Sequence, residues 1–464
     1  MKKRILACIL ALTMTASLLA GCGSDAGNAN SSAETDAEPE AAADAAQEEV
    51  KEEEPAAEAD AGNEDQADGE KFDKEVTLTF WSPTWHKDAD EQVIADFAKL
   101  YPNIKIEATF YSTDDIKTNT KVAASSGTLP DMWYNWGGFN FANYYASADL
   151  CYDLTAYAKE NGWEDKYLKS ALDLCTLDGK VIALPQVYTG LVMWYRTDIL
   201  EQYGLEVPKT FEELENICEV LKENGQASFS TGGWHIFRYL EALLEYYAGP
   251  EEHDALNTLE ADWASSEAVT QAFAKLKEWG DKGYFIDGYV TEDANNAKMY
   301  VFGGTSAMVM DNSGMASDVV ANGYDTSQYS FFAFPTGKDG NTGRISSYVK
   351  TTQFNKNLTD DQFEAAMIFW DYYYSEESLK SHPSIEQPTA IAGAELSEAM
   401  QLADGMLEMI DAAGSYTTTD QDVPNEIMDV VFATEEAVLL GTIEPSAAGA
   451  EIQKAIDAYK AASK

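Results

Sequence analysis

The sequence predicts an α/β fold in two lobes. From Val76 onward, short runs rich in β-branched and aromatic residues alternate with segments of helical period, and this order builds a parallel, doubly wound sheet. The chain after residue 70 holds all ten Trp and is too long for one ordinary hydrophobic core. In sheets of this kind, ligands bind near the carboxyl ends of the strands.

Five segments show the alternation in order. They are a strand over 76–80, a helix over 89–100, a strand over 104–110, a helix over 114–125 and a strand that begins near Asp131. The first helix places Val93 and Phe97 one turn apart and stops before Pro102. The turn 81–86 and the stretch 133–138 each follow a strand, so we expect both at the ligand-binding edge.

Two local signals follow further along the chain. Gly179-Lys180 makes a hairpin-like turn that feeds a strand over 181–184. Pro185 is expected to end that strand and to direct the chain toward the second lobe. Thr210 begins a helix as its N-cap, and Glu213 three residues later completes a capping box.

The first 21 residues have the pattern of an export signal. Three bases at 2–4 precede an apolar run over 5–19, which is too short to remain a membrane span. The run Leu19-Ala20-Gly21-Cys22 resembles the lipobox of bacterial lipoproteins, which implies a lipid on Cys22 and a chain anchored on the extracellular face of the cell membrane. The alternative is a plain signal peptide with an incidental Cys. Residues 22–70 contain a single base among many acids and are predicted to form a disordered tether.

The charge and the cysteine usage exclude several functions. A formal net charge of −49 argues against nucleic acid as a partner. Beyond the lipid-bearing position, Cys151, Cys175 and Cys218 allow at most one intramolecular disulfide, and spacing alone does not establish Cys151–Cys175. The four His are scattered and neither C-x-x-C nor H-E-x-x-H occurs, so we expect no metal site and no cofactor.

Several motifs in a fixed order resemble one family. They are Gly127-x-x-Pro130-Asp131-Met132, 178–185, 194–200, 203–214, 303–310, Phe334-Pro335 and the closing segment 441–459. Together they resemble the extracellular solute-binding proteins of ABC transporters, in the group of sugar binders. The resemblance covers almost all of the chain from Val76 to Lys460.

The resemblance implies an architecture. It is a two-lobed, periplasmic-binding-protein-like fold in which each lobe is a mostly parallel sheet flanked by helices. Three crossings join the lobes near 185–190, 306–310 and 347–354. The N-lobe would comprise 76–185 plus 310–347, and the C-lobe 191–305 plus 352–464. Such crossings make a hinge that closes around a ligand.

The resemblance also places a cleft, and the residues there suit a sugar. Aromatic planes stack on sugar rings while polar side chains bond the hydroxyl rim. The expected ligand contacts are Trp81, Trp85, His86, Asn135, Trp136, Tyr188, Trp234, His235, Asp311, Asn312, Ser313, Tyr348 and Glu386. Trp136, Trp234 and Trp85 are the best platform candidates. The sequence context assigns Trp263, Trp279 and Trp370 to the core, Trp133 fits an inward position, and Asp311 or Ser313 has capping of the next helix as its alternative.

The predicted function is that of a substrate-binding lipoprotein of an ABC importer. It would capture a carbohydrate as a monomer and deliver it to the membrane-embedded permease subunits. An oligosaccharide is favoured, since several platforms imply several rings. The alternative is a polyamine or another cation, bound through cation–π contacts. An enzyme is disfavoured, because Gly-x-Ser-x-Gly, the P-loop and the dinucleotide fingerprint are absent, and carboxylate pairs that would fit a glycosidase arise by chance among eighty acids.

Overall fold

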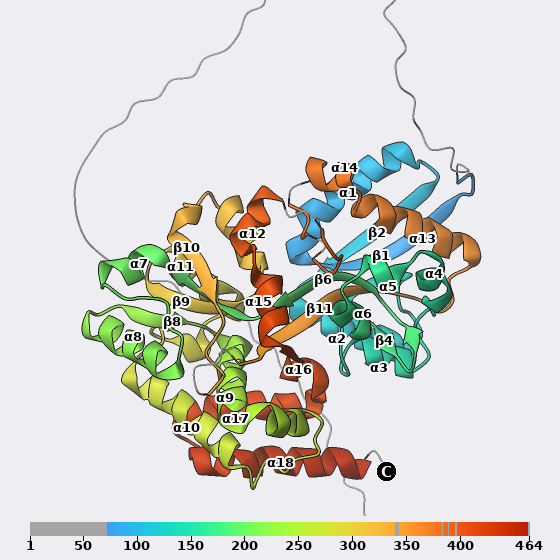
Figure 1. Ribbon diagram of the computed structural model, residues 1–464. Coiled ribbons are helices and arrows are strands. Elements are labelled where there is room, and N and C mark those ends of the chain that lie inside the picture. Colours follow the sequence, from blue (N-terminus) through green and yellow to red (C-terminus); the bar gives the residue numbers. More distant parts are fainter. Residues whose placement is uncertain (1–71, 339–342, 383, 388, 395–396, 463–464) are drawn as a thin grey trace, which may run out of the picture. The chain divides into compact units, whose positions relative to one another are not determined.

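The computed structural model describes residues 72–338, 343–382, 384–387, 389–394 and 397–462 (Figure 1). The expected signal peptide, the lipid-bearing Cys22 and the tether fall on residues outside this part of the chain. Within the described ranges no helix combines the length and apolar character needed to cross a membrane. The same ranges contain no cluster of His, Cys, Asp and Glu that could hold a metal ion.

The first sheet holds the strands that the sequence predicts. Its members are β1 (Val76–Pro83), β2 (Ile104–Tyr111), β3 (Met132–Trp136), β6 (Leu184–Gly190), β11 (Ile345–Phe354) and β12 (Ser415–Thr417). The order is β12-β11-β3-β1-β2, and β6 also pairs with β11. β2 and β3 run parallel to β1, whereas β11 is antiparallel to β3 and β6. β1 extends to Pro83, so Trp81 belongs to the strand and the predicted turn shrinks to the short 3-10 helix η1 (Thr84–His86).

The two predicted helices of this sheet are confirmed to within two residues. They are α1 (Lys87–Leu100) and α2 (Thr113–Ser126), the latter capped by Ser112 and ended by Gly127 at φ 71°. α13 (Asp360–Tyr373) packs beside α1 on β1 (Figure 1), where Trp370 meets Phe80 edge to face at 5.5 Å. The smaller helices here are α3 (Ala142–Ser147), α4 (Thr155–Glu160), α5 (Trp163–Lys166), α6 (Lys169–Asp173) and α14 (Glu376–Ser381).

The second sheet has the order β10-β7-β9-β8. Its strands are β7 (Val192–Arg196), β8 (Ala227–Ser230), β9 (Ser306–Asp311) and β10 (Tyr329–Phe332). Here the expectation of a mostly parallel sheet is wrong, because β7 runs antiparallel to both β9 and β10. Only β8 and β9 are parallel, and the helices between them provide the crossover that parallel neighbours need.

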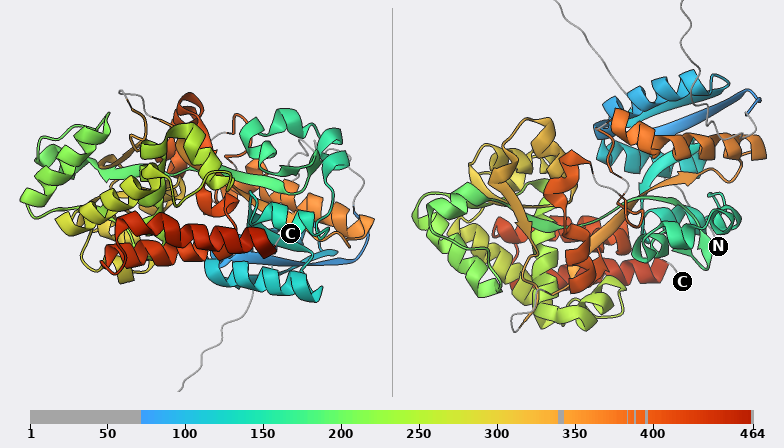
Figure 2. Two further views of the ribbon diagram at one scale, coloured as in Figure 1. Left: turned by 90° about the horizontal axis from the view of Figure 1, so that it is seen from below. Right: turned by 45° about the horizontal axis from the view of Figure 1, so that its top comes forward.

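Helices make up most of the remaining structure. They are α7 (Thr197–Gln202), α8 (Phe211–Glu223), α9 (Ile236–Asn257), α10 (Glu267–Lys282), α11 (Ala297–Phe302), α12 (Gly314–Ala321), α15 (Met406–Ala413), α16 (Thr419–Asp422), α17 (Asn425–Leu439) and α18 (Pro445–Ala462). The 3-10 turns are η2 (Gly233–His235), η3 (Tyr289–Thr291), η4 (Ala294–Asn296), η5 (Thr326–Gln328) and η6 (Glu398–Ala403). α17 and α18 run side by side against α10 (Figure 2). The predicted capping box of Thr210 and Glu213 opens α8.

The hairpin-like turn is confirmed, but the strand after it is not. Asp178 and Gly179 both have positive φ and join β4 (Thr176–Leu177) to β5 (Lys180–Val181), as a two-residue hairpin of primed type requires. The predicted strand over 181–184 is instead split between β5 and β6. Pro185 does not end a strand: it lies inside β6, beside a register shift in the pairing with β11, and such irregularities are where a strand tolerates proline.

The two sheets divide the chain differently from the predicted lobe bounds. β10 falls in 310–347, expected in the N-lobe, but it pairs with β7 in the second sheet. α13 falls in 352–464, expected in the C-lobe, but it packs on β1. The lobe bounds inferred from motifs were wrong here because the strand pairing and helix packing that assign a segment to a sheet are long-range contacts.

The aromatic core follows the sequence closely. Trp133, Trp263 and Trp279 are completely buried and Trp370 is 3% exposed, as predicted for all four. Cys151, Cys175 and Cys218 are free thiols, so the disulfide that spacing left open is not formed.

Gly449 in α18 provides a test of this packing. A Cβ at this position would stand 2.2 Å from the backbone oxygen of Trp263. In an ordinary helix interior, alanine is about 1 kcal/mol more stable than glycine, but here the overlap forces α18 away from its neighbour. We expect Gly449→Ala to lower the free energy of unfolding by about 1–3 kcal/mol in urea denaturation of the full chain. Ala458→Gly, at an exposed position of the same helix, measures the ordinary stability difference between alanine and glycine. A gain in stability for Gly449→Ala would contradict the close packing of α18 against Trp263.

Candidate functional site

One pocket brings together aromatic and charged side chains from segments far apart in the sequence. We call it the aromatic pocket, and it encloses about 60 Å³. It is lined by Thr113, Lys117, Trp136, Phe141, Leu191, Trp234, Phe237, Arg238, Tyr348, Thr418, Asp420 and Gln421. These residues come from α2, the end of β3, the residue before α3, the link between β6 and β7, η2 with the start of α9, β11 and the segment around α16.

Glycines fix the two tryptophans at the pocket. Trp136 ends β3, and the chain then turns through Gly137, where a Cβ would lie 2.5 Å from Val349, and Gly138 at φ 99°. Trp234 follows Gly232, where a Cβ would lie 2.7 Å from a backbone oxygen, and Gly233 at φ 45°. Both turns need residues without a side chain. Trp136 therefore stands at the end of its strand, and Trp234 stands in the short 3-10 turn η2.

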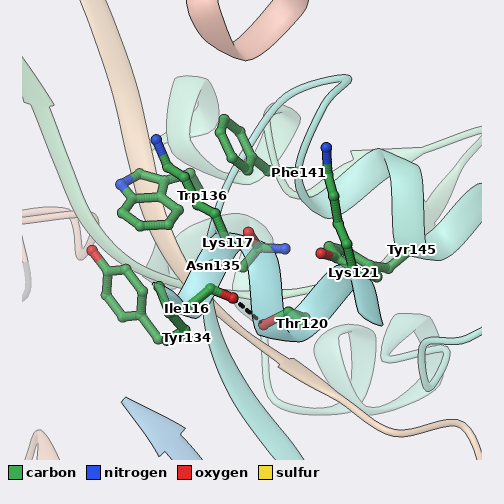
Figure 3. A pocket seen from close by; sticks show the side chains of 9 residues that line it. All are labelled: Ile116, Lys117, Thr120, Lys121, Tyr134, Asn135, Trp136, Phe141 and Tyr145. Carbon is green, nitrogen blue, oxygen red and sulfur yellow. Dashed lines mark hydrogen bonds between the residues drawn. The ribbon is translucent and has the colours of Figure 1, made fainter. Parts of the chain in front are cut away.

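Lys117 of α2 lies among the rings of the pocket. Figure 3, which draws a neighbouring pocket that shares Lys117, Trp136 and Phe141 with the aromatic pocket, shows this side chain beside two of the rings. Its Nζ is 5.2 Å from the ring centres of Trp136 and Phe141 and 5.4 Å from that of Trp234. These are cation–π distances. The ammonium group thus joins rings that β3 and η2 contribute separately.

Arg238 stands one helical turn after Trp234 and is held by two acceptors. It donates to the backbone oxygen of Met310 at 2.8 Å and to Asp311 at 3.0 Å. Burial raises the pKa of the Asp311 carboxyl, but the charges of Arg238, Lys298 and His235 outweigh burial and the pKa falls below its ordinary value. Arg238 therefore presents to the pocket a guanidinium that is held in place and whose positive charge is paired with Asp311.

Two adjacent side chains at the pocket keep unused hydrogen-bonding capacity. Asp420 Oδ1 and Gln421 Oε1 are buried, and neither has a hydrogen-bond partner in the described part of the chain. Burial raises the pKa of the Asp420 carboxyl, although Lys117 and Arg238 act in the opposite direction. Buried polar atoms without partners are rare in folded proteins. These two point to a ligand with hydrogen-bond donors.

A second group of residues lies beside the pocket, which we call the Glu386 cluster. Glu386 contacts His86 at 3.1 Å and also pairs with Lys350. Burial raises the pKa of the Glu386 carboxyl, but Lys350 and His86 dominate and lower the pKa to about 2. Tyr134 links the cluster to the pocket, with its ring 5.5 Å from that of His86 and 5.0 Å from that of Trp136. The Tyr134 hydroxyl is buried without a partner among the described residues.

The structure brings only some of the expected contacts to the pocket. Trp136, Trp234 and Tyr348 line it, and Asp311 reaches it through Arg238. Trp85, 47% exposed, stands edge to face with Tyr134 at 5.9 Å. It belongs with His86 and the Glu386 cluster at the border of the pocket.

Other expected contacts have structural partners instead. Trp81 packs on Tyr111 at 5.1 Å. Asn135 donates to Gln353 at 2.7 Å, and Tyr188 donates to Ser347 at 3.1 Å. These side chains are held in or near the sheet and do not line the aromatic pocket.

The stretch 311–313 and His235 also differ from the expectation. The Asp311 side chain pairs with Arg238 and does not cap α12, and Ser313 precedes α12 without a capping hydrogen bond from its side chain. Asn312 Oδ1 accepts from the Gly314 amide at 2.7 Å. His235 is buried, and burial lowers its pKa well below the ordinary value.

Sequence reasoning missed nine residues of the pocket lining. They are Thr113, Lys117, Phe141, Leu191, Phe237, Arg238, Thr418, Asp420 and Gln421. Arg238 lies one helical turn beyond Trp234, which is a signal that periodicity offered. Lys117 sits within a predicted helix and Asp420 within a polar segment, so neither had a local pattern that separated it from other surface residues.

Comparison with known proteins gives a consistent result. The model of one protein family, described as bacterial extracellular solute-binding protein, matches residues 83–380. A multiple sugar-binding protein of Streptococcus mutans is 23% identical over 289 residues, which are 61% of this chain and 67% of that protein. An ABC transporter extracellular-binding protein of Pyrococcus horikoshii is 24% identical over 242 residues, 50% of this chain. The chain spans about half the length of this relative and of a second one from the same organism, 53% and 48%.

A solved structure shares the fold. A chitin oligosaccharide binding protein superposes with a TM-score of 0.74 at 23% identity, over 82% of this chain and 98% of that chain. The likeness confirms the two-lobed α/β fold class predicted from the sequence.

The Glu386 cluster should make the free energy of unfolding depend on pH. The pKa of Glu386 falls from 4.5 to about 2 on folding, so its stabilising effect is complete above pH 4.5 and is lost as the pH falls toward 2. The shift corresponds to on the order of 3 kcal/mol. We expect Glu386→Gln to flatten the decline in unfolding free energy between pH 4.5 and 2.5 by this order, measured by urea denaturation. Glu206→Gln, at an exposed carboxylate, is the control, and parallel profiles for wild type and Glu386→Gln would refute the assignment.

Proposed function

The chain belongs to the family of bacterial extracellular solute-binding proteins, and from this premise we propose that it captures a carbohydrate in the aromatic pocket. The ligand is an oligosaccharide, delivered to the permease of an ABC importer. No chemical step is part of this function.

The observation that carries the proposal is the pairing of two tryptophan platforms with unused acceptors. Trp136 and Trp234 stand at the same pocket as Asp420 Oδ1 and Gln421 Oε1. A sugar ring offers flat C–H faces to aromatic rings and hydroxyl donors to such acceptors. The ligand would therefore satisfy the pocket's two kinds of unmet contact at once.

Similar proteins support the choice of ligand. The Streptococcus relative is named as a multiple sugar-binding protein, and an α-glucosides-binding protein of Rhizobium meliloti is 24% identical over 236 residues. The Glu386 cluster and Trp85 extend the aromatic surface beyond the pocket, which suits a ligand of more than one ring.

Capture requires the pocket to open. Its present volume of about 60 Å³ has room for a few water molecules and not for a sugar ring. Its walls come from α2 and β3 on one side and from η2 and α9 on the other. Separation and closure of these elements about the links between the two sheets is a hinge motion.

A polyamine is a poorer ligand for this pocket. Its ammonium groups would have to enter beside Lys117 and Arg238. The ring faces that attract a cation already hold the Lys117 ammonium. Like charges at these distances would oppose the binding that cation–π contacts favour.

We further propose that the chain is a lipoprotein that works as a monomer outside the cell. The lipobox-like run that ends at Cys22 supports a lipid anchor, and the acidic residues 23–70 support a tether. The tether would let the binding domain stand away from the membrane and meet the permease.

Substitution of each platform tests the function. We expect Trp136→Ala and Trp234→Ala each to weaken binding of the cognate oligosaccharide by about tenfold or more, because each removes one stacked ring. Isothermal titration of the full chain against mono- and oligosaccharides and polyamines would measure this. Tyr144→Ala, which removes an exposed ring outside the pocket lining, should leave affinity within about twofold. Binding of amines only, or unchanged affinity in both Trp variants, would contradict the proposal.

A further inference from the structure

Lys117 is a pocket cation without an acidic partner. No carboxylate of the described residues comes within 4 Å of its Nζ, and its neighbours there are the rings of Trp136, Phe141 and Trp234. The other cations of the site are paired, Arg238 with Asp311 and Lys350 with Glu386. Lys117 therefore differs from both.

The lack of a partner is notable in a chain of this composition. The sequence has 80 acids and 31 bases, so carboxylates are available to most cations. Asp420 lines the same pocket but does not form an ion pair with Lys117, and its Oδ1 is one of the atoms without a partner. The protein holds the ammonium in place with ring faces and gives it no direct ion pair, although its charge acts across the pocket on the pKa of Asp420.

The ring contacts position the charge where a ligand must lie. Lys117 is half-buried and reaches between Trp136 and Phe141 (Figure 3). A ring stacked on Trp136 or Trp234 would bring its substituents within reach of Nζ. A charge-assisted bond formed there is shorter and stronger than a neutral one.

We propose that the captured oligosaccharide is acidic, with an anionic substituent on a ring in the aromatic pocket that pairs with Lys117. This inference rests on the proposed function and names the class of sugar. The shared chemistry is an anion on a sugar ring, which a uronate carboxylate or a sulfate ester supplies. The anion completes the contact that the protein leaves open.

The acidic surface does not exclude such a ligand. Charges on the surface are screened beyond about 8–10 Å at physiological ionic strength, whereas Lys117 would contact the ligand directly. Arg238 adds a second cation to the pocket lining, and its own charge is balanced by Asp311. Within the pocket lining, the charge of Lys117 is therefore opposed by the carboxyl group of Asp420, whose pKa is raised by burial.

Lys121 offers a matched control on the same helix. It lies one turn after Lys117, has its Nζ 5.8 Å from the Tyr144 ring and, in the described residues, also forms no ion pair. It does not line the aromatic pocket. A change at Lys121 removes the same charge from the same helix without touching the proposed contact.

The test measures the preference for an acidic sugar over its neutral counterpart. Galacturonate and glucuronate oligomers would be titrated against galactose and glucose oligomers of equal length, with O-sulfated galactose oligomers as a third arm. We expect the acidic member of one pair to bind the full chain about tenfold tighter or more, and this preference to fall with added salt. The carboxylate and sulfate arms identify the source of the anion.

Variants decide whether Lys117 is responsible. Lys117→Met keeps the aliphatic stem and should reduce the ratio of acidic-sugar affinity to neutral-sugar affinity to about one. Lys117→Arg and Lys121→Met should retain most of that ratio. Thermal unfolding without ligand would verify that each variant is folded. Tight binding of neutral sugars without an acidic preference, or a preference that survives in Lys117→Met, would overturn this inference and leave the proposed function intact. Failure of every sugar to bind would overturn both.

Discussion

The structure depends on the pairing of β11 with three other strands. β11 bonds to β3 on one side and to β6 on the other, and its first residues also pair with β12. All ten of its residues are buried. Since β3 leads to one wall of the aromatic pocket and β6 leads directly into the second sheet, the position of β11 sets where the two walls meet.

Because β11 is buried, its polar side chains need partners within the protein, and several of these partners belong to the site. Tyr348 lines the pocket, Lys350 pairs with Glu386, and Gln353 accepts from Asn135. A buried lysine is costly unless it is paired, so Lys350 fixes the loop that carries Glu386. Through His86 and Tyr134 the same ion pair supports the border of the pocket. The stability of the sheet and the geometry of the site thus share one set of contacts.

The site also differs electrostatically from the rest of the molecule. The chain is strongly acidic, yet the pocket collects Lys117 and Arg238 beside a single unpaired carboxyl group, that of Asp420. Cations held among aromatic rings repel cationic ligands such as amines. The same cations can donate hydrogen bonds to acceptor groups on a ligand. Specificity for a class of sugar can therefore come from a few charges placed against stacking surfaces, without a large polar interface.

Short-range patterns determined what the sequence could reveal. The glycines beside Trp136 and Trp234 predicted exposed platforms, but Trp136 is 8% exposed and Trp234 is half-buried. The first strands and helices, the capping box at Thr210 and the turn at Asp178-Gly179 all follow from residues within a few positions of one another. The opposite direction of β7, the packing of α13 on β1 and the meeting of Lys117, Arg238 and Asp420 do not. These depend on contacts between segments more than one hundred residues apart, and such contacts are set by how the sheets pair and bury their faces, which no local periodicity encodes.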